Sequence, residues 1–320
     1  MLDLQLLSLN KFSCCIFAVG YACCIRRHLV IEVSRSLLLT PPSLPADAFF
    51  TPFEDFKPDY PLPDKFGFPF QYEPHPISLL AVNMLQTHLE NQQDWDHNFG
   101  LTNDKENVIG KMFGVLVVET EQAQIGYIAA FSGKLAGGNH HPKFVPPIFD
   151  GVANDGFLNA GMTALSQMND EIKTLESSEN EAFETTIAAL KVLRKKHSVS
   201  LQNAIFDQYY FLNQAGEKRG LREIFADASY KNPPAGAGEC AAPKLLQYAF
   251  QNKMKPLAMA EFWWGMSPKS DFWKHGHFYP ACREKCAPIL AHMLAGIEMD
   301  IVKKSAQPHD TCLRVRSELS

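Results

Sequence analysis

The residues whose type and spacing could do chemistry are three cysteines in the last third of the sequence, Cys240, Cys282 and Cys286. Thiolate sulfur is a soft ligand that suits zinc, and a tetrahedral site could add His275, His277 or a water as its fourth ligand. The C-x3-C interval places Cys282 and Cys286 on one helical face, one turn apart. These residues predict a structural zinc site, and the alternative is a set of small thiols buried in a core.

Two helices must deliver these thiols. A Gly/Pro-rich segment, NPPAGAGE, precedes Cys240, and Pro243 fits a helix only in its first turn, so a helix is expected to begin at about Cys240. A short apolar strand, KPLAMAEFWWG, follows, and a second helix is expected to begin near Cys282. Unsatisfied N–H groups and the helix dipole favour thiolate at both helix starts.

The preceding sequence predicts a sheet and a covering helix. Apolar residues recur with helical spacing in ISLLAVNMLQTHLENQ, and Ser78 can cap that helix. Two β-branched runs, KMFGVLVVET and QIGYIAAFSGK, are joined by a polar connection and predict a β-hairpin. The expected fold is therefore an α/β domain in which helices flank a mixed sheet.

A long helical insertion is predicted over residues 160–214. Leu165, Met168, Ile172 and Leu175 repeat at intervals of 3, 4 and 3, which is the spacing of a helical hairpin or a short coiled coil. Acidic side chains dominate its first part and basic side chains its later part. Such a charged helix is either a solvated face that suits its own dipole or a surface that contacts phosphate.

The candidate RNA-binding residues are the cations of this insertion, together with an aromatic residue and a lysine further along the chain. An aromatic ring near a lysine can stack on a base, although core packing is the alternative use of any single ring. The candidates are Lys191, Arg194, Lys195, Lys196, Trp264 and Lys269.

Composition limits the class of protein. The 320 residues are 46% hydrophobic and 20% charged, which is typical of a globular protein and excludes a disordered or collagen-like chain. A net charge of −5 means that any nucleic-acid contact must be a local basic patch. Eight cysteines are too sparse for a disulfide scaffold and fit a reducing compartment, so a cytoplasmic protein is expected. No window in the body of the chain is long and apolar enough to span a membrane, and no membrane partner is expected.

The chain is expected to contain one α/β domain with flanking segments. Residues 1–40 include the apolar run FSCCIFAVGYACCI, which is too short to span a membrane, and are interpreted as a non-native or disordered extension, with a signal peptide as the alternative. The domain comprises residues 41–159, with an extended Pro/aromatic segment, the helix and the hairpin, and residues 215–300, with the Cys/His-bearing part. Residues 301–320 form a tail.

The order helix, two strands, helix with Cys240, strand, helix with Cys282 resembles the core of the zinc-dependent deaminase superfamily. That family has [H/C]-x-E on one helix and P-C-x2-C on the next, and its Glu moves protons for a zinc-bound water. Here Ala242 stands in place of that Glu, and the second motif reads P-A-C-x3-C. The resemblance implies a deaminase-like fold without deaminase activity, unless Glu239 or Glu261 substitutes for the missing carboxylate.

Longer stretches of sequence resemble a different family. FGFPFQYEPHP, GKMFGVLVVE, HHPKFVPPIFD, PPAGAGECAAPKLLQYAF, AEFWWGMSPK and HGHFYPACREKCAPILAHML are similar to the N-terminal region of a bacterial branch of the RNA pseudouridine synthase A family. The similarity covers about residues 50–300. In that family a catalytic domain follows, with an Asp in an H-R-L-D-like motif, and neither Asp300 nor Asp310 lies in such a context.

The resemblance implies an accessory RNA-associated domain of a pseudouridine synthase, with rRNA or tRNA as its partner and no catalytic residue in this chain. The cofactor expected from the cysteines is a structural zinc ion. Two other functions stay open. One is a zinc-dependent nucleoside or nucleic-acid deaminase, and the other is a structural interaction module that forms a homodimer through the helical insertion.

Overall fold

The structure is a computed structural model that describes residues 48–54, 60–70, 73–103, 106–151, 157–178 and 180–300. The predictions for residues 1–40 and 301–320 lie outside these ranges. Within them the chain forms an α/β fold of six α-helices and two antiparallel sheets, so the predicted α/β class is confirmed. The predicted mixed sheet is not observed, because all named strand pairs in the described residues are antiparallel.

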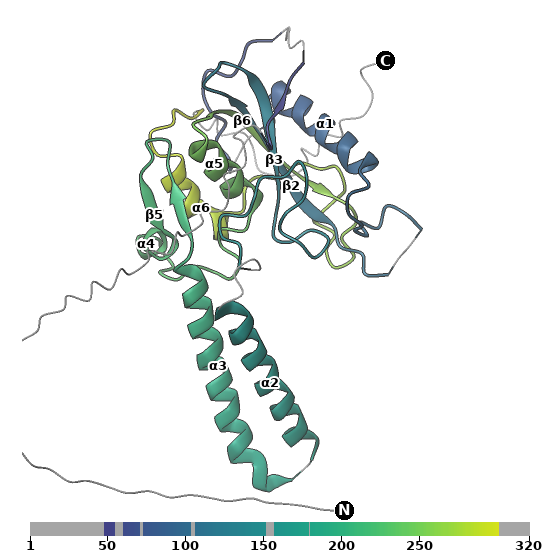
Figure 1. The fold of residues 1–320 in the computed structure, drawn as a ribbon, viewed down its shortest axis with the longest axis vertical. Coiled ribbons are helices and arrows are strands. Elements are labelled where there is room, and N and C mark those ends of the chain that lie inside the picture. The colour runs from purple at the N-terminus through teal and green to yellow at the C-terminus, as the bar shows by residue number, and fades with distance from the viewer. Residues whose placement is uncertain are drawn as a thin grey trace, which may run out of the picture. The chain divides into compact units, whose positions relative to one another are not determined.

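The larger sheet has four strands in the order β1-β3-β2-β6 (Figure 1). Its members are β1 (Thr51–Pro52), β2 (Lys111–Glu119), β3 (Ile125–Phe131) and β6 (Lys255–Trp264). The predicted hairpin is confirmed, because β2 pairs antiparallel with β3. Strand β2 also pairs antiparallel with β6, which comes from the distant C-terminal part of the chain. The apolar run of β2 is buried because this central strand is covered on both faces.

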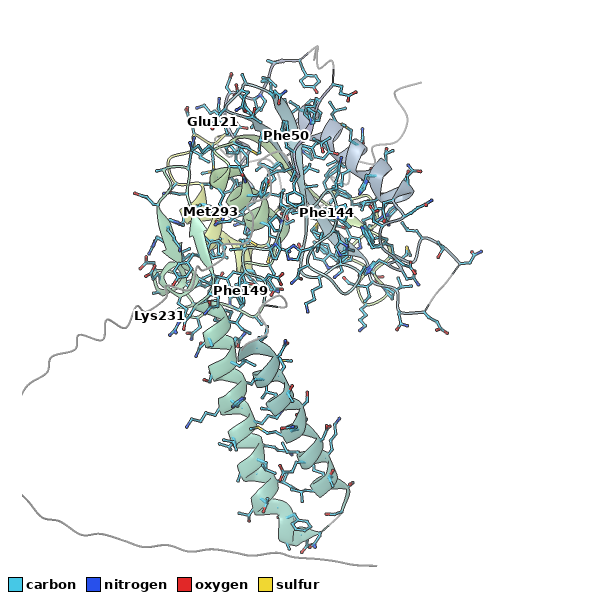
Figure 2. All side chains as sticks on the ribbon, viewed as in Figure 1. Phe50, Glu121, Phe144, Phe149, Lys231 and Met293 are labelled. Atoms are coloured by element: carbon cyan, nitrogen blue, oxygen red, sulfur yellow. The ribbon has the colours of Figure 1, made fainter. Side chains whose placement is uncertain are left out.

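Helices cover both faces of the sheet. Helix α1 (Pro76–Asn91) packs on one face and α5 (Ala241–Gln251) on the other, and α6 (Arg283–Met293) packs against α5. The two resulting cores are separate clusters of apolar side chains, and Figure 2 labels Phe144 in the α1-side cluster and Met293 in the α5-side cluster.

The residues of β2 and β6 alternate between these two clusters. Phe113 and Phe262 belong to the α1-side cluster, whereas Leu116 and Met259 belong to the α5-side cluster. Because successive side chains of a strand point to opposite faces, the face of each neighbouring residue follows from this register. Glu261 therefore faces α5, and Trp264 faces α1.

Helix α1 begins earlier than the sequence suggested. Its N-cap is His75, whose side chain accepts a hydrogen bond from the N–H of Ile77, and Pro76 is the first helical residue. Ser78, the predicted cap, lies inside the first turn, where its hydroxyl donates to the carbonyl of His75. Proline is favoured at the first helical position because that position needs no N–H donor, and the cap therefore lies three residues before Ser78.

The predicted insertion is a helical hairpin. Helices α2 (Phe157–Ser177) and α3 (Glu184–Phe206) lie side by side and are joined through a short 3-10 helix, η1 (Glu181–Phe183) (Figure 1). Ile172 is buried between them, and Gly161 allows α3 to come close, because a Cβ at that position would lie 2.6 Å from the side chain of Leu201.

The helical part of the insertion ends before residue 214. After α3 the chain forms a two-stranded sheet of β4 (Tyr210–Leu212) and β5 (Lys218–Gly220), followed by α4 (Leu221–Ala226). No described helix combines the length and the apolar character that crossing a membrane requires.

Candidate thiol site

The three predicted cysteines are free thiols at the ends of two helices. Cys240 is the N-cap of α5 and Cys282 is the N-cap of α6, as the sequence predicted. Cys286 lies one turn further into α6. Cys240 is half-buried, Cys282 is exposed and Cys286 is fully buried.

Cys286 brings the thiols together. Its side chain hydrogen-bonds with the thiols of both Cys240 and Cys282. These two neighbours and the burial of the sulfur raise the pKa of Cys286 well above its ordinary value. The packing of α6 against α5 therefore joins residues that are more than forty positions apart in the sequence.

Cys282 is the anionic member of the set. The hydrogen bond from the Cys286 thiol is the largest influence, and backbone N–H groups of Lys285 and Glu284 add to it, so that the pKa of Cys282 falls to about 5 despite partial burial. A thiol at a helix start is stabilised as thiolate by these otherwise unpaired N–H groups. The lowered pKa favours the thiolate form of Cys282 at neutral pH.

Glu261 lies on the face of β6 that α5 covers, close to Cys282. Its side chain is buried, with 4% exposure, and burial raises its pKa to about 7, assisted by the nearby Cys282. The N–H of Ala242 donates to its carboxylate and opposes that rise. Gly114 of β2 lets α5 approach the sheet here, because a Cβ on it would lie 3.1 Å from the side chain of Ala241.

This placement distinguishes the two glutamates that could replace the missing carboxylate at position 242. Glu261 reaches the backbone of Ala242 itself. Glu239 instead accepts a hydrogen bond of 3.5 Å from the hydroxyl of Tyr209, whose pKa is raised by burial and by this carboxylate. Glu261 is therefore the one of the two whose carboxylate contacts the backbone at position 242.

A buried lysine next to the thiols was missed by the sequence interpretation. Lys244 Nζ donates to the carbonyls of Phe131 (2.9 Å) and Gly133 (3.2 Å) at the end of β3. Burial lowers its pKa to about 8, while the nearby carboxylate of Glu239 opposes the shift. The available signal was its position one turn after Cys240, on a helix whose other residues are mostly apolar.

The two histidines predicted as a fourth ligand lie elsewhere. His275 Nδ1 accepts a hydrogen bond of 3.0 Å from the N–H of Gly265, and its ring packs edge-on against Trp264 at 4.4 Å. Because Trp264 belongs to the α1-side cluster, His275 lies across the sheet from the thiols. The backbone of His277 pairs with Trp263 next to β6. Neither residue is brought to the cysteines, because the loop that carries them follows the edge of β6.

The thiols contact one another in pairs but do not point to a common centre. Among the described side chains, no three His, Cys, Asp or Glu groups are arranged as the ligands of a metal ion. The donor types themselves suit zinc, because thiol sulfur is a ligand that zinc prefers.

The predicted RNA-binding cations are on the surface of α3. Arg194, Lys195 and Lys196 are exposed. Lys191 is exposed as well, but its ammonium forms a 2.7 Å ion pair with Glu176 of α2. Three of the four cations are therefore free to contact RNA phosphate, whereas Lys191 mainly links α3 to α2 through its ion pair.

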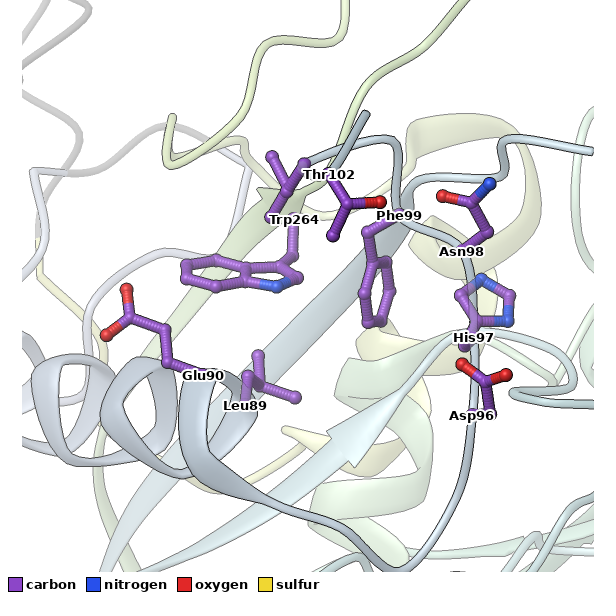
Figure 3. A pocket seen from close by; sticks show the side chains of 9 residues that line it. Leu89, Glu90, Asp96, His97, Asn98, Phe99, Thr102 and Trp264 are labelled. Carbon is purple, nitrogen blue, oxygen red and sulfur yellow. The ribbon is translucent and has the colours of Figure 1, made fainter. Parts of the chain in front are cut away.

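Trp264 is unsuited to stacking on a base. Its side chain is only 4% exposed, packed against Phe262 at 6.2 Å, so the prediction of an RNA-stacking ring at this position is wrong. The neighbouring pocket of about 430 Å³ has the indole and Phe99 in its wall, with the carboxylates of Glu90 and Asp96 on either side (Figure 3). Two carboxylates would repel phosphate, so this pocket also does not fit RNA.

An exposed ring near Lys269 is instead Phe272. Its side chain is 65% exposed and contacts Trp273, with ring centres 4.8 Å apart. Trp273 in turn stacks on Trp263 at 5.0 Å. Lys269 and Lys274 are exposed on the same loop. Burial alone decides which rings are free, and this is not readable from the aromatic run in the sequence.

Comparison with known proteins adds no relative to this description. No protein-family model, no curated protein and no solved structure matches the chain.

Proposed function

We propose that this chain is an RNA-associated accessory domain whose deaminase-like core holds a structural zinc ion and has no deaminase activity. The observation that carries the proposal is the contact of the Cys240 and Cys282 thiols with the buried thiol of Cys286. The resemblance to the N-terminal region of RNA pseudouridine synthase A proteins supports the association with RNA.

A deaminase-like arrangement is supported by the order of elements. The hairpin of β2 and β3 is followed by α5, β6 and α6, with a thiol at each of the two helix starts. The hairpin of α2 and α3 then corresponds to an insertion between β3 and α5, with the seam spacing of a coiled coil.

Cys240, Cys282 and Cys286 would hold the zinc ion. When bound, zinc would supply a cross-link between the starts of α5 and α6, and the energy of binding would become folding energy. A structural role is favoured over a catalytic one because Glu261, whose carboxylate interacts with Cys282, is only 4% exposed and therefore poorly placed to meet a substrate.

RNA contact would use the exposed cations of α3. Arg194, Lys195 and Lys196 are adjacent in sequence and exposed, so they form a local basic patch on a chain with a net charge of −5. The loop with Phe272, Lys269 and Lys274 offers a second surface, on which an exposed ring could stack on a base.

Elemental analysis and thermal melts test the zinc site. The full chain, purified without a metal-binding tag, is expected to contain about one zinc per chain. Cys240→Ser and Cys282→Ser should lose the metal and melt at lower temperature. The matched controls are His275→Ala and His277→Ala, which should keep it. Zinc below about 0.2 per chain, with both cysteine variants melting like the parent, would show that these cysteines are ordinary thiols that bind no metal.

Salt-dependent binding tests the RNA surface. Affinity for a labelled rRNA fragment is measured over a range of salt concentrations for the parent and for a variant with Arg194, Lys195 and Lys196 changed to Gln. The log–log slope should become shallower by roughly 2, since each lost phosphate contact removes about 0.7 to 0.9. The control changes Lys253 and Lys255, which pair with Glu121 and Glu119, and should leave the slope unchanged.

Two activity assays complete the test. Pseudouridine counted by mass in rRNA and tRNA should not rise above the blank, and cytidine and adenosine should not be deaminated. Deamination that stops when zinc is removed would replace the structural role of the site with a catalytic one.

A further inference from the structure

We propose that the pocket beside Trp264 binds a linear aliphatic diamine, with one ammonium group at each of two carboxylates and the alkyl chain against the apolar wall between them. This site lies on the α1 side of the sheet. The proposal depends neither on zinc nor on RNA binding.

The pocket has the size of a small-molecule site. Its volume is about 430 Å³, which lies within the range of ligand pockets in proteins. Three parts of the chain form it, namely the last turn of α1, the loop of residues 96–102 and the end of β6 at Trp264. A ligand held here would contact all three.

The negative charge of the pocket is not balanced by the residues around it. Glu90 and Asp96 both line the pocket, and both side chains are exposed. Neither carboxylate forms an ion pair with any side chain that the structure describes. The described lining also contains no lysine or arginine. A bound cation would therefore meet two carboxylates without displacing an existing partner.

His97 lines the pocket but brings no positive charge to it. Its Nδ1 accepts a hydrogen bond of 3.3 Å from the N–H of Ala136, so the ring proton is on Nε2, which donates to the carbonyl of Ile109 at 2.8 Å. Burial is the main influence on this ring, and it lowers the pKa of His97. The imidazole is therefore neutral, and the two carboxylates decide the charge of the pocket.

The part of the pocket between the carboxylates is apolar. Glu90 and Asp96 lie on opposite sides of the Trp264 and Phe99 rings (Figure 3), and Leu101 adds a half-exposed side chain to the wall. An aromatic ring attracts an ammonium group, and an apolar wall favours an alkyl chain. A linear diamine has the same pattern of charge, apolar chain and charge.

Other ligands fit the pocket less well. The two carboxylates would repel a phosphate group. A divalent metal ion needs more oxygen ligands than this apolar wall offers, and no three His, Cys, Asp or Glu side chains in the described part of the chain are arranged to hold one. An organic cation remains the ligand class that matches both the charge and the wall.

The loop that forms the wall is held in place by its own hydrogen bonds. Asn98 Oδ1 accepts from the N–H of Gly100 at 2.8 Å, and its Nδ2 donates to the carbonyl of Glu106 at 2.7 Å. The carbonyl of Phe99 accepts from the N–H of Met266 at 2.7 Å, which ties the loop to the segment after β6. Binding would therefore not have to order this loop, and a preformed site loses less affinity to ordering.

Ligand-observed NMR titrations of the full chain test the proposal with 1,5-diaminopentane as the probe. Pentylamine and 1,5-pentanediol are the matched controls, because they keep the carbon chain and lack one or both charges. The diamine should bind roughly fivefold more tightly than pentylamine, since an exposed ion pair contributes up to about this factor. The diol should not bind. In a series of diamines of increasing length, affinity should pass through a maximum, because both ammonium groups reach the carboxylates only at a matching spacing.

Carboxylate variants locate the binding site. Glu90→Gln and Asp96→Asn should each weaken diamine binding roughly fivefold and remove the preference for the diamine over pentylamine. Asp94→Asn is the matched control, because Asp94 is an exposed carboxylate close to Asp96 that does not line the pocket. It should change the affinity by less than about twofold. All three side chains are exposed, so the variants should melt like the parent.

Several results would overturn the proposal. They are the absence of saturable diamine binding, equal affinities for the diamine and pentylamine, and affinities that Glu90→Gln and Asp96→Asn leave unchanged. An affinity that only rises with chain length would indicate apolar contact alone. Displacement of the diamine by magnesium at constant ionic strength would identify the pocket as a metal site instead.

The zinc and RNA assays described above are independent of these titrations. Loss of zinc or of RNA binding in those assays would leave the diamine site standing, and a failed diamine titration would leave the proposed function untouched.

Discussion

The backbone N–H of Ala242 donates a hydrogen bond to the buried carboxylate of Glu261, although the two residues belong to different elements, α5 and β6. In the deaminase-like arrangement that we propose, Ala242 stands where that superfamily has a glutamate. The carboxylate next to the backbone of Ala242 therefore comes from Glu261 on strand β6. Helix α5 can lie close to the sheet at this point because Gly114 has no side chain, and a Cβ there would lie 3.1 Å from the side chain of Ala241.

Glu261→Gln should change how stability depends on pH. Burial raises the pKa of Glu261 to about 7 from 4.5, so the folded chain keeps a proton that the unfolded chain loses. The contribution of Glu261 to the free energy of unfolding is therefore fully present below pH 4.5 and declines as the pH rises through about 7. The neutral amide lacks this decline, so the variant should gain up to about 3 kcal/mol relative to the parent between pH 4.5 and pH 8.

Urea unfolding of both proteins at several pH values measures this difference. A gap between variant and parent that stays constant with pH would mean that the Glu261 carboxyl titrates normally.

Lys244→Met should destabilise the fold. The ammonium group donates to the carbonyls of Phe131 and Gly133, and methionine keeps much of the side-chain length but has no donor. Loss of hydrogen bonds to buried groups should lower the free energy of unfolding by about 1–3 kcal/mol. Lys253→Met is the control, because Lys253 forms only an exposed ion pair with Glu121 and should change stability by less than about 1 kcal/mol. Equal effects of the two substitutions in denaturant melts would show that the buried contacts contribute little.

Alkylation of Cys282 should be nearly independent of pH above pH 6. With its pKa lowered to about 5, mainly by the hydrogen bond from Cys286, this thiol is already thiolate there. Its rate with iodoacetamide, followed by peptide mass in the presence of a zinc chelator, should change less than about twofold between pH 6 and pH 8. Free cysteine in the same tube should accelerate roughly 50-fold. A Cys282 that accelerates like free cysteine would contradict the assigned environment.

Ile172→Ala should loosen the helical hairpin and little else. Ile172 is the buried side chain of α2, 6% exposed, and its truncation removes contacts with α3 at a cost of about 2–5 kcal/mol. Val192→Ala is the matched control, since Val192 is 70% exposed. Hydrogen exchange should become faster in α2 and α3 of the first variant, with the sheet and α5 unchanged. Equal acceleration throughout the chain would indicate that the hairpin and the sheet unfold together.

The sequence by itself determined the features that depend on neighbouring residues. The hairpin of β2 and β3 follows from two β-branched runs with a short connection, and the helix starts at Cys240 and Cys282 follow from nearby glycines and prolines. The 3 and 4 spacing of apolar residues likewise predicted α2 and α3. Such patterns are readable because turns, caps and helical faces involve residues only a few positions apart.

Only the tertiary structure decided which distant residues meet. Lys244 bonds to carbonyls more than a hundred positions away, and Glu261 reaches Ala242 because β6 pairs with β2. The sequence alone does not show which face of β6 turns towards α1. The orientation that β6 adopts buries Trp264 and places His275 across the sheet from the thiols. Strand side chains alternate with a period of two, so the faces of β6 are fixed only when neighbouring strands and helices bury one of them.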